Sequence, residues 1–406
     1  MKYGRCVLTG ITVMILAALG VWDQLVETQS RGAESGPEYR FDPTWPKPLP
    51  SVNDAQGRTL AQVSGGVGTH CIDSRDHVFQ FNRSYLNPSE YSTAGTTPAP
   101  PVVEFDAQGN VVNSWGDPTL TPQGISAVLP HNTHGCFVDY QDNVWVASNG
   151  DGVVQKWSHD GRKMLLQIGT KGVCDGAPTL SPKSPLPTCG APGNNSSRTL
   201  LNEAADVAVD PNPDPVTGER GSVYIADGYG NHRIVVFNSQ GKYLRQWGSM
   251  GTGPGQFYPT GGGHPHCVVL GNDGLVYACD RQGNRIQVFD RRGTLKRVIV
   301  VTPPGTTASG GVHVERSVSD IAFSRDPQQK LIFVAYYGCG CASPEGGRLY
   351  IVDRESGAVV GGIGRPGPAA GEFLSAHSIG LDSKGNVYVG ESPMGRRTQR
   401  FVKVGG

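Results

Sequence analysis

The chain has 406 residues, with 57 glycines, 30 prolines and only 17% charged residues. Lysine plus arginine and aspartate plus glutamate number 35 each, so no net field exists that would attract nucleic acid or an anionic membrane surface. Abundant glycine and proline, combined with many short apolar runs, favour a large all-β unit, which can reach this length as one domain.

The first 26 residues have the character of an export signal. Lys2 and Arg5 precede an apolar run that ends in small residues. We favour a cleaved signal peptide, with an uncleaved N-terminal membrane anchor as the alternative. Residues 27–50 are rich in serine, glycine and proline and are expected to form a linker. Residues 51–406 are then expected to hold the fold of an exported protein, periplasmic or secreted.

Removal of the signal would leave eight of the nine cysteines, an even number in a chain bound for an oxidising compartment. Cys174 and Cys189 bracket an insertion rich in proline, glycine and serine, so they are the leading disulfide pair. Closing a loop of this size stabilises a fold by about 3 kcal/mol in the chain-entropy model. Cys339 and Cys341 flank a single glycine and are expected to pair elsewhere, if at all.

An internal repeat organises the chain after residue 50. Each copy has an apolar strand, a polar turn and a second strand that opens with Val or Ile and an aromatic residue. The six second strands are expected at residues 78–81, 144–147, 223–226, 276–279, 332–335 and 387–390. A period of roughly 45–70 residues with four strands per copy is typical of a β-propeller, and six copies predict six blades around a central channel.

The last copy ends near Val404 after about three strands, so a strand from the other terminus is expected to complete the ring. The prolines between residues 40 and 49 make that segment a poor strand, which leaves the closing segment open. The long insertions at 84–101, 171–200 and 303–317 are expected to be loops.

The first strands of the six copies can be aligned on the polar turn that follows each of them. Five positions before the turn residue, the copies carry Gly68, His134, Ala205, His266, Ser319 and His377. Alternate blades of a six-fold ring lie about 120° apart, so three histidines would ring the channel at one depth. Three neutral imidazoles with an open fourth position suit Zn²⁺. Four other histidines are out of phase and are interpreted as surface residues or supports of the site: His70, His131, His232 and His264.

The ends of the second strands fall on the same mouth of the channel, because first and second strands run antiparallel. These ends carry Arg83, Arg281 and, one residue further on in its own blade, Tyr229. Guanidinium groups suit a substrate carboxylate. A tyrosine beside a dication and two arginines can have its pKa lowered enough to act as a base. The pattern predicts metal-assisted chemistry on a small carboxylate-bearing or peptide substrate.

Several stretches of the chain resemble the NHL-repeat propeller peptidyl-α-hydroxyglycine α-amidating lyase, the lyase half of the peptide-amidating system. The resemblance covers the whole propeller and is strongest from Leu201 to Phe289, where the matching stretches are Ala205–Pro211, Ala226–Ile234, Pro254–Phe257, Pro265-His266, Asp280-Arg281 and Arg285–Gln287. The family cleaves the C–N bond of a carbinolamide to give a peptide amide and glyoxylate.

What the resemblance implies can be stated residue by residue. His134, His266 and His377 would hold zinc, and Tyr229 would be the general base. Arg83 and Arg281 would bind the substrate and orient Tyr229.

The chain departs from the family pattern at three positions. Ser378 stands where the family has an aspartate that supports a structural calcium, so the resemblance does not carry calcium over. Ser375 replaces a methionine close to the third metal histidine, and Gly230 replaces a cysteine, which removes that family disulfide.

Two other functions remain open on the sequence. A metal-dependent lactonase or hydrolase on the same propeller would use the metal to activate water for attack on an ester. A non-catalytic NHL-repeat module would bind protein or glycan partners through the mouth of the channel.

Overall fold

The computed structural model describes residues 36–83, 95–116, 129–130, 132–176, 179–180, 187–189, 193–259, 264–302, 317–338 and 347–405. They belong to a unit of residues Gly36–Gly406 that is separate from Met1–Ser35. The expected signal peptide therefore lies outside the described residues. Within the described ranges, none of the secondary structure is a helix of the length and apolarity needed to span a membrane.

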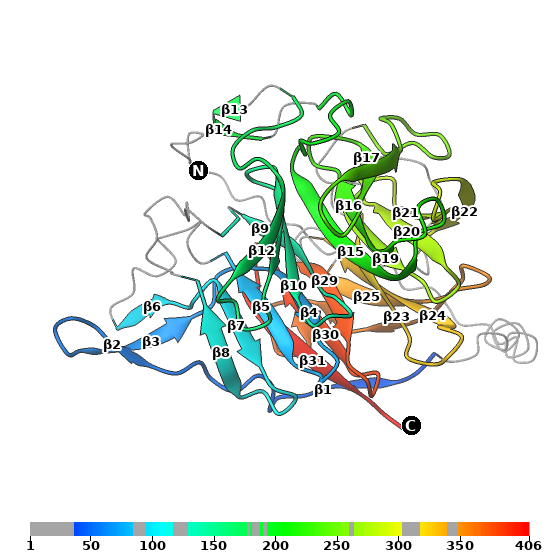
Figure 1. Ribbon diagram of the computed structural model, residues 1–406. Coiled ribbons are helices and arrows are strands. Elements are labelled where there is room, and N and C mark those ends of the chain that lie inside the picture. Colours follow the sequence, from blue (N-terminus) through cyan, green and yellow to red (C-terminus); the bar gives the residue numbers. More distant parts are fainter. Residues whose placement is uncertain are drawn as a thin grey trace, which may run out of the picture. The chain divides into compact units, whose positions relative to one another are not determined.

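Six four-stranded antiparallel sheets make up most of this unit (Figure 1). The first sheet contains β4 (Val67–Ile72), β5 (Val78–Asn82), β7 (Val102–Phe105) and β8 (Val111–Trp115). The second contains β9 (Thr133–Val138), β10 (Val144–Ser148), β11 (Val153–Trp157) and β12 (Met164–Gly169). The third contains β15 (Ala204–Pro213), β16 (Arg220–Asp227), β17 (Arg233–Phe237) and β18 (Tyr243–Trp247).

The remaining sheets repeat the same order. The fourth contains β19 (Cys267–Leu270), β20 (Leu275–Asp280), β21 (Arg285–Asp290) and β22 (Leu295–Val300). The fifth contains β23 (Ser317–Phe323), β24 (Leu331–Tyr337), β25 (Arg348–Asp353) and β26 (Val359–Ile363). The sixth contains β29 (Ala376–Leu381), β30 (Val387–Glu391), β31 (Thr398–Lys403) and, from the start of the unit, β1 (Tyr39–Phe41).

The first strand of each sheet faces its counterparts around a closed ring. β4 contacts β9, β9 contacts β15, and the series continues through β19, β23 and β29 back to β4. This arrangement confirms the all-β propeller with six blades. Each expected second strand lies within β5, β10, β16, β20, β24 or β30.

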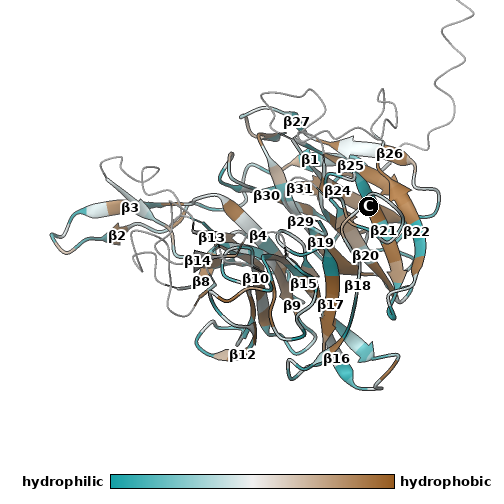
Figure 2. Cartoon of the chain, turned by 90° about the horizontal axis from the view of Figure 1, so that it is seen from above, coloured by the Kyte–Doolittle hydropathy of each residue, from teal (hydrophilic) through white to brown (hydrophobic). Residues whose placement is uncertain are grey.

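Apolar side chains fill the six seams between neighbouring sheets, and each seam has its own buried cluster. Hydrophobic residues are concentrated on the strands, whereas many of the turns between them are hydrophilic (Figure 2). A sheet sandwiched between two others must bury both faces, which explains the nearly continuous apolar runs in the middle strands.

The segment expected to be a linker, 27–50, contributes to the ring. β1 pairs antiparallel with β31, from Tyr39 opposite Lys403 to Phe41 opposite Phe401. Trp45 follows and is 2% exposed in the seam between the sixth and first sheets. Three residues of regular pairing are enough for a closing strand, and β1 fits between Pro37 and the proline-rich stretch that starts at Pro43.

The insertions are not wholly loops, which corrects the sequence expectation. β2 (Val52–Asn53), β3 (Thr59–Val63) and β6 (Thr96–Pro98) form a three-stranded sheet outside the six blades. β13 (Thr179–Leu180) and β14 (Pro187–Thr188) pair within the insertion at 171–200, and β27 (Arg365–Pro366) pairs with β28 (Glu372–Phe373). The insertion at 303–317 falls almost entirely outside the described residues.

Three disulfides join described residues. Cys174 and Cys189 are bonded as expected, and they close the insertion after the second sheet. Cys71–Cys136 links β4 to β9 across the first seam, and Cys267–Cys279 links β19 to β20. Cys339 and Cys341 lie outside the described residues. The three bonds suit an oxidising compartment.

We predict that Trp45→Ala destabilises the ring at its closing seam. The indole packs against Phe105 and Tyr388, with ring centroids 5.5 and 4.8 Å away. Loss of a buried tryptophan costs about 3–5 kcal/mol. Urea unfolding measures the loss, and Trp45→Phe should retain much of the stability. Equal stability of Trp45→Ala and the wild type would show that the segment does not close the ring.

We also predict a pH dependence of stability from His70. This histidine is buried against the sixth sheet, with Nδ1 2.9 Å from Ser378 Oγ, and burial lowers its pKa to about 4. The unfolded chain takes up a proton below its ordinary pKa of about 6.5, whereas the folded chain does not, so stability falls as pH drops through this range. Urea midpoints at pH 7 and pH 5 should show that His70→Gln removes about 2 kcal/mol of that loss. An identical pH dependence in wild type and variant would contradict the assignment.

Candidate metal centre

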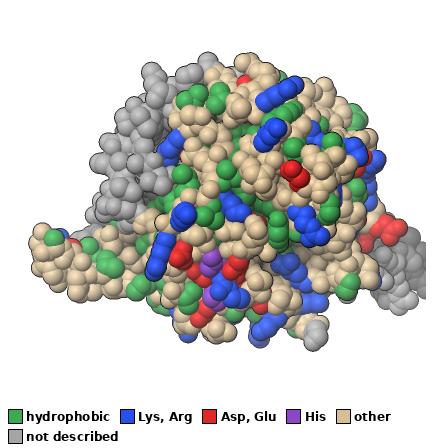
Figure 3. Space-filling view, in the orientation of Figure 1, with side chains coloured by type: hydrophobic (Ala, Val, Ile, Leu, Met, Phe, Trp, Pro, Cys, Tyr) green, Lys and Arg blue, Asp and Glu red, His purple; other side chains and the backbone are tan. Residues whose placement is uncertain are grey.

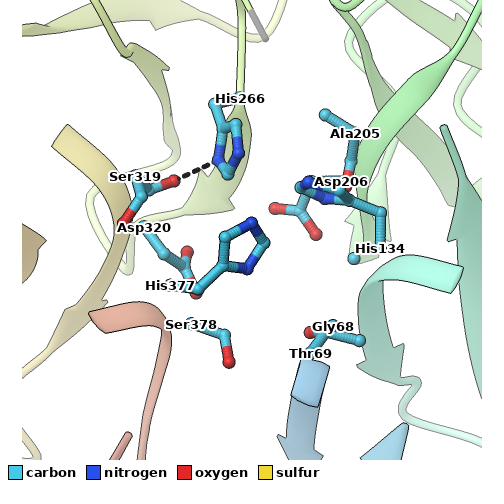
Figure 4. A pocket seen from close by; sticks show the side chains of 11 residues that line it. Gly68, Thr69, His134, Ala205, Asp206, His266, Ser319, Asp320, His377 and Ser378 are labelled. Atoms are coloured by element: carbon cyan, nitrogen blue, oxygen red, sulfur yellow. Dashed lines mark hydrogen bonds between the residues drawn. The ribbon is translucent and has the colours of Figure 1, made fainter. Parts of the chain in front are cut away.

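The three in-phase histidines come from alternate sheets and meet at one mouth of the channel (Figure 4). His134 lies in β9, His266 directly before β19, and His377 in β29. Their ring centroids are 4.6, 4.7 and 5.1 Å apart, and one nitrogen of each lies within 4.8 Å of those of the others. All three side chains are buried.

Backbone carbonyls of the next sheet fix two of these imidazoles. His134 Nδ1 lies 2.7 Å from the Ala205 carbonyl oxygen, and His266 Nδ1 lies 2.6 Å from that of Ser319. A carbonyl can only accept, so each Nδ1 carries the hydrogen and each Nε2 presents a lone pair. Outer hydrogen bonds of this kind orient histidines that bind metals.

The third imidazole, that of His377, also faces the in-phase residue of the next sheet, Gly68, but its Nδ1 makes no hydrogen bond of normal geometry. Burial lowers the pKa of His377 by more than the Gly68 backbone raises it. The backbone neighbours of the three imidazoles are Ala205, Ser319 and Gly68, the small in-phase residues of the sheets that lack histidine.

Tyr229 lies between two of the histidines. Its hydroxyl oxygen is 2.9 Å from His134 Nε2 and 3.0 Å from His266 Nε2. The hydroxyl has one proton, so it can donate to only one of these two lone pairs at a time. The Nε2 atoms of His134 and His266 and the Tyr229 oxygen thus lie close together. With the nearby His377 imidazole, this donor set fits a divalent cation such as zinc.

The two arginines lie beside this donor set and contact different neighbours. Arg281 donates from Nη1 to the Tyr229 hydroxyl at 3.2 Å, and its guanidinium lies 4.4 Å from the Tyr337 ring centroid. Arg83 donates from Nε to the Thr133 carbonyl at 2.7 Å, beside His134. A methyl group on Gly68 would lie 2.6 Å from Arg83 Nε, so a larger residue there would displace the guanidinium.

Burial dominates the electrostatics of the site. It lowers the pKa of His134, His266 and His377 well below 6.5, and neighbouring imidazoles and arginines lower the pKa values further. The three rings are thus neutral and able to bind a metal around pH 7. Burial raises the pKa of Tyr229, and the opposing pull of Arg281 and Arg83 is smaller. The two arginines alone therefore do not outweigh burial, and the lowering expected beside a bound dication stays a prediction.

Sequence reasoning missed two half-buried carboxylates that support the histidine-bearing strands. Asp206 accepts the Val268 backbone N–H at 2.9 Å, and Asp320 accepts that of Ile379 at 2.9 Å. These N–H groups lie two residues beyond His266 and His377, on strand edges that face the channel. The sequence feature that could have revealed them is an aspartate directly after the in-phase small residue, as in Ala205-Asp206 of the third repeat and Ser319-Asp320 of the fifth. Both carboxylates border a cavity of about 20 Å³ that the three histidines also line.

Where they are described, the out-of-phase histidines are buried, so they are not surface residues. His70, which is bonded to Ser378 beside His377, fits the other interpretation, a support of the site. His70, His232 and His264 are 4%, 7% and 1% exposed. The rings of His232 and His264 stack at 6.3 Å. His131 lies outside the described residues.

The departures from the family pattern have local explanations. Ser378 bonds to His70, so a neutral pair occupies the position of the family's aspartate. Ser375 donates to the Met394 carbonyl at 2.9 Å. A methyl group on Gly230 would lie 2.3 Å from the Asn202 side chain, which leaves no room for a cysteine there.

The fold is a six-bladed β-propeller, and one stretch of it matches a known repeat. Residues 263–289 match the family model of the NHL repeat. A gluconolactonase from Xanthomonas campestris has a similar structure, with a TM-score of 0.50 at 12% identity, covering 90% of this chain and 99% of that one. At this identity the likeness shows the fold alone.

The sequence is similar to those of an NHL repeat-containing protein and of peptide-amidating enzymes. It is 28% identical over 198 residues to NHL repeat-containing protein 3 of Homo sapiens, covering 47% of this chain and 46% of that protein. It is 27% identical over 365 residues to peptidyl-glycine alpha-amidating monooxygenase B of Xenopus laevis, covering 86% of this chain and 34% of that protein. It is 26% identical over 242 residues to a probable peptidyl-alpha-hydroxyglycine alpha-amidating lyase of Caenorhabditis elegans, covering 57% of this chain and 56% of that protein.

The chain therefore spans about half or less of the length of each of these relatives. The resemblance to the amidating lyases, inferred from the sequence, is confirmed at modest identity.

We predict that Asp320→Ala destabilises the protein by about 1–3 kcal/mol, because it leaves the buried Ile379 N–H without its acceptor. Asp320→Asn keeps an acceptor oxygen and should remain within about 1 kcal/mol of the wild type. Urea unfolding at pH 7 measures both variants. Similar losses for the two variants would show that the backbone hydrogen bond is not what Asp320 contributes.

Proposed function

We propose that this chain is a zinc-dependent lyase that cleaves the C–N bond of a peptidyl-α-hydroxyglycine, giving a peptide amide and glyoxylate. The observation that supports this most strongly is the placement of the Tyr229 hydroxyl. It lies 2.9 and 3.0 Å from Nε2 of two neutral histidines and 3.2 Å from an Arg281 nitrogen. A proton acceptor, a metal-binding donor set and a carboxylate-binding cation thus occupy one mouth of the channel.

His134, His266 and His377 would hold the zinc, which would supply Lewis-acid polarisation of a substrate oxygen. The guanidinium groups of Arg281 and Arg83 would bind the carboxylate of the hydroxyglycine and fix the orientation of its hydroxyl. Arg281 also holds the Tyr229 oxygen in place through its hydrogen bond.

Tyr229 would act as the general base. As the phenolate, it removes the proton of the substrate hydroxyl. The C–O bond becomes the aldehyde of glyoxylate while the electron pair of the C–N bond leaves with nitrogen. Tyr229 then returns the proton to that nitrogen, which completes the amide. Because burial raises the Tyr229 pKa, ionisation depends on the positive charges around it, namely Arg281, Arg83 and the bound dication.

The comparisons support an amidating reaction more than a lactonase reaction. A relative named as a probable α-hydroxyglycine amidating lyase matches 57% of the chain, whereas the gluconolactonase resembles it only in fold. The disulfides are consistent with a role outside the reducing cytosol. We therefore propose an exported enzyme whose substrate is a small α-hydroxyglycine compound or peptide.

We predict that Tyr229→Phe lowers glyoxylate release from an α-hydroxyglycine peptide by about 10²–10⁴-fold while zinc content stays unchanged. His266→Ala should lose both zinc and activity, because two imidazoles alone hold the ion weakly. Tyr140→Phe, at an exposed tyrosine remote from the mouth, is the matched control.

Product analysis separates the alternatives. Release of glyoxylate supports the lyase, and release of a plain acid from an ester or lactone would instead indicate a hydrolase. Wild-type rates in Tyr229→Phe, or a purified chain that binds zinc but turns over neither class of substrate, would contradict the proposal.

A further inference from the structure

A second group of potential ligands lies at the seam between the first and second sheets, on the face opposite the three histidines. Asp73 is in the β4–β5 turn, Glu104 is near the end of β7, and His159 is in the β11–β12 turn. In antiparallel sheets these positions share one edge, and the three ligand atoms lie within 4.8 Å of one another.

The distances within this group match a metal site. His159 Nε2 lies 3.6 Å from Asp73 Oδ2 and 3.6 Å from Glu104 Oε1. Zinc bonds to nitrogen and oxygen of about 2.0–2.2 Å in a tetrahedron place neighbouring ligands about 3.3–3.6 Å apart. The side chains of Asp73, Glu104 and His159 are 0%, 6% and 22% exposed, so they are nearly withdrawn from water yet reachable.

Neighbouring groups orient all three ligands. His159 Nδ1 is 3.1 Å from the Asp142 carbonyl oxygen, which leaves the Nε2 lone pair facing the two carboxylates. Asp73 Oδ1 accepts the backbone N–H groups of Arg75 and His77, and Oδ2 accepts from Nε and Nη2 of the Arg75 guanidinium at 3.1 and 2.8 Å. His77 Nδ1 lies 2.7 Å from Glu104 Oε1.

A positive charge already occupies the point where the ligands converge. Arg75 Nη2 lies 2.8 Å from Asp73 Oδ2 and contacts His159 Nε2. The Arg75 side chain is 51% exposed, so it can rotate into solvent without disturbing the core. The carboxylates of Asp73, Glu104 and Asp142 face this single guanidinium, and the excess negative charge favours a divalent ion over it.

The group is open to solvent. Among the described histidines, His77 and His159 escape full burial. Figure 3 shows histidine side chains at the surface with acidic and basic side chains around them.

We propose that Asp73, Glu104 and His159 form a second zinc site. The ion binds when the Arg75 side chain rotates into solvent, and it then links the first sheet to the second. One imidazole with two carboxylates suits a borderline divalent ion such as Zn²⁺ better than Ca²⁺, which prefers oxygen ligands throughout. This site is independent of the lyase reaction and uses none of its residues.

The test is the zinc content of the full chain after chelation, reloading with Zn²⁺ and desalting. The wild type should hold about two zinc ions per chain, one in each ligand set. His159→Gln and Glu104→Gln should each lose the zinc ion of the second site and hold about one per chain. Asp160→Asn, at the neighbouring exposed turn residue, should keep both zinc ions. Far-UV circular dichroism confirms that each variant is folded.

Arg75→Gln provides an independent arm. Removal of the competing guanidinium should tighten binding at this site about tenfold in a chelator competition titration. Equal zinc content in the wild type, His159→Gln and Glu104→Gln, or unchanged affinity in Arg75→Gln, would overturn the second site. His266→Ala tests the channel histidines separately, so failure of either site is distinguishable from failure of the other.

Discussion

The hydrogen bonds from imidazole Nδ1 atoms to backbone carbonyls of the next sheet are the constraint on which the site depends. His134 is held by Ala205 and His266 by Ser319, at 2.7 and 2.6 Å. Each bond crosses a seam, so the orientation of a ligand is set by how two sheets pack. The closure of the ring therefore also determines the geometry of the metal site.

The sixth seam shows how far this coupling extends. His377 belongs to the sixth sheet, and its neighbour across the seam is Gly68 of the first. That seam is filled by Trp45, which follows β1 at the start of the unit. The β1 side chains Tyr39 and Phe41 pack instead in the seam between the fifth and sixth sheets. A segment without a chemical role thereby helps to set the position of the third imidazole.

Alternation around the ring gives each sheet one of two tasks. The second, fourth and sixth sheets supply histidines. The first, third and fifth supply a small residue whose carbonyl faces the preceding histidine, and in two cases an aspartate that binds the next histidine-bearing strand. The small side chains leave space for groups at the mouth, as Gly68 does for Arg83.

The repeat in the sequence was sufficient to predict six blades and the phase of the three histidines, because both follow from the spacing of strands and turns. The Cys174–Cys189 bond was also predictable, since both cysteines bracket one insertion. Cys71–Cys136 was not, because it joins residues 65 positions apart in sequence whose proximity appears only once two sheets are packed.

Other features depend on packing that no local pattern reports. β1 precedes a proline-rich stretch that reads as a linker, and its pairing with β31 spans nearly the whole chain. The raised pKa of Tyr229 reflects complete burial, whereas the sequence showed only its charged neighbours. Asp206 and Asp320 are ordinary strand residues by pattern, and their role follows from the exposed strand edges they contact.

Anomalous diffraction at the zinc absorption edge, from crystals of the zinc-loaded protein, tests the central claim most directly. The account predicts a peak in the mouth of the channel within bonding distance of Nε2 of His134, His266 and His377, with each Nδ1 still turned to a backbone carbonyl. A channel without such a peak, or an ion bound through Nδ1 of these residues, would contradict it.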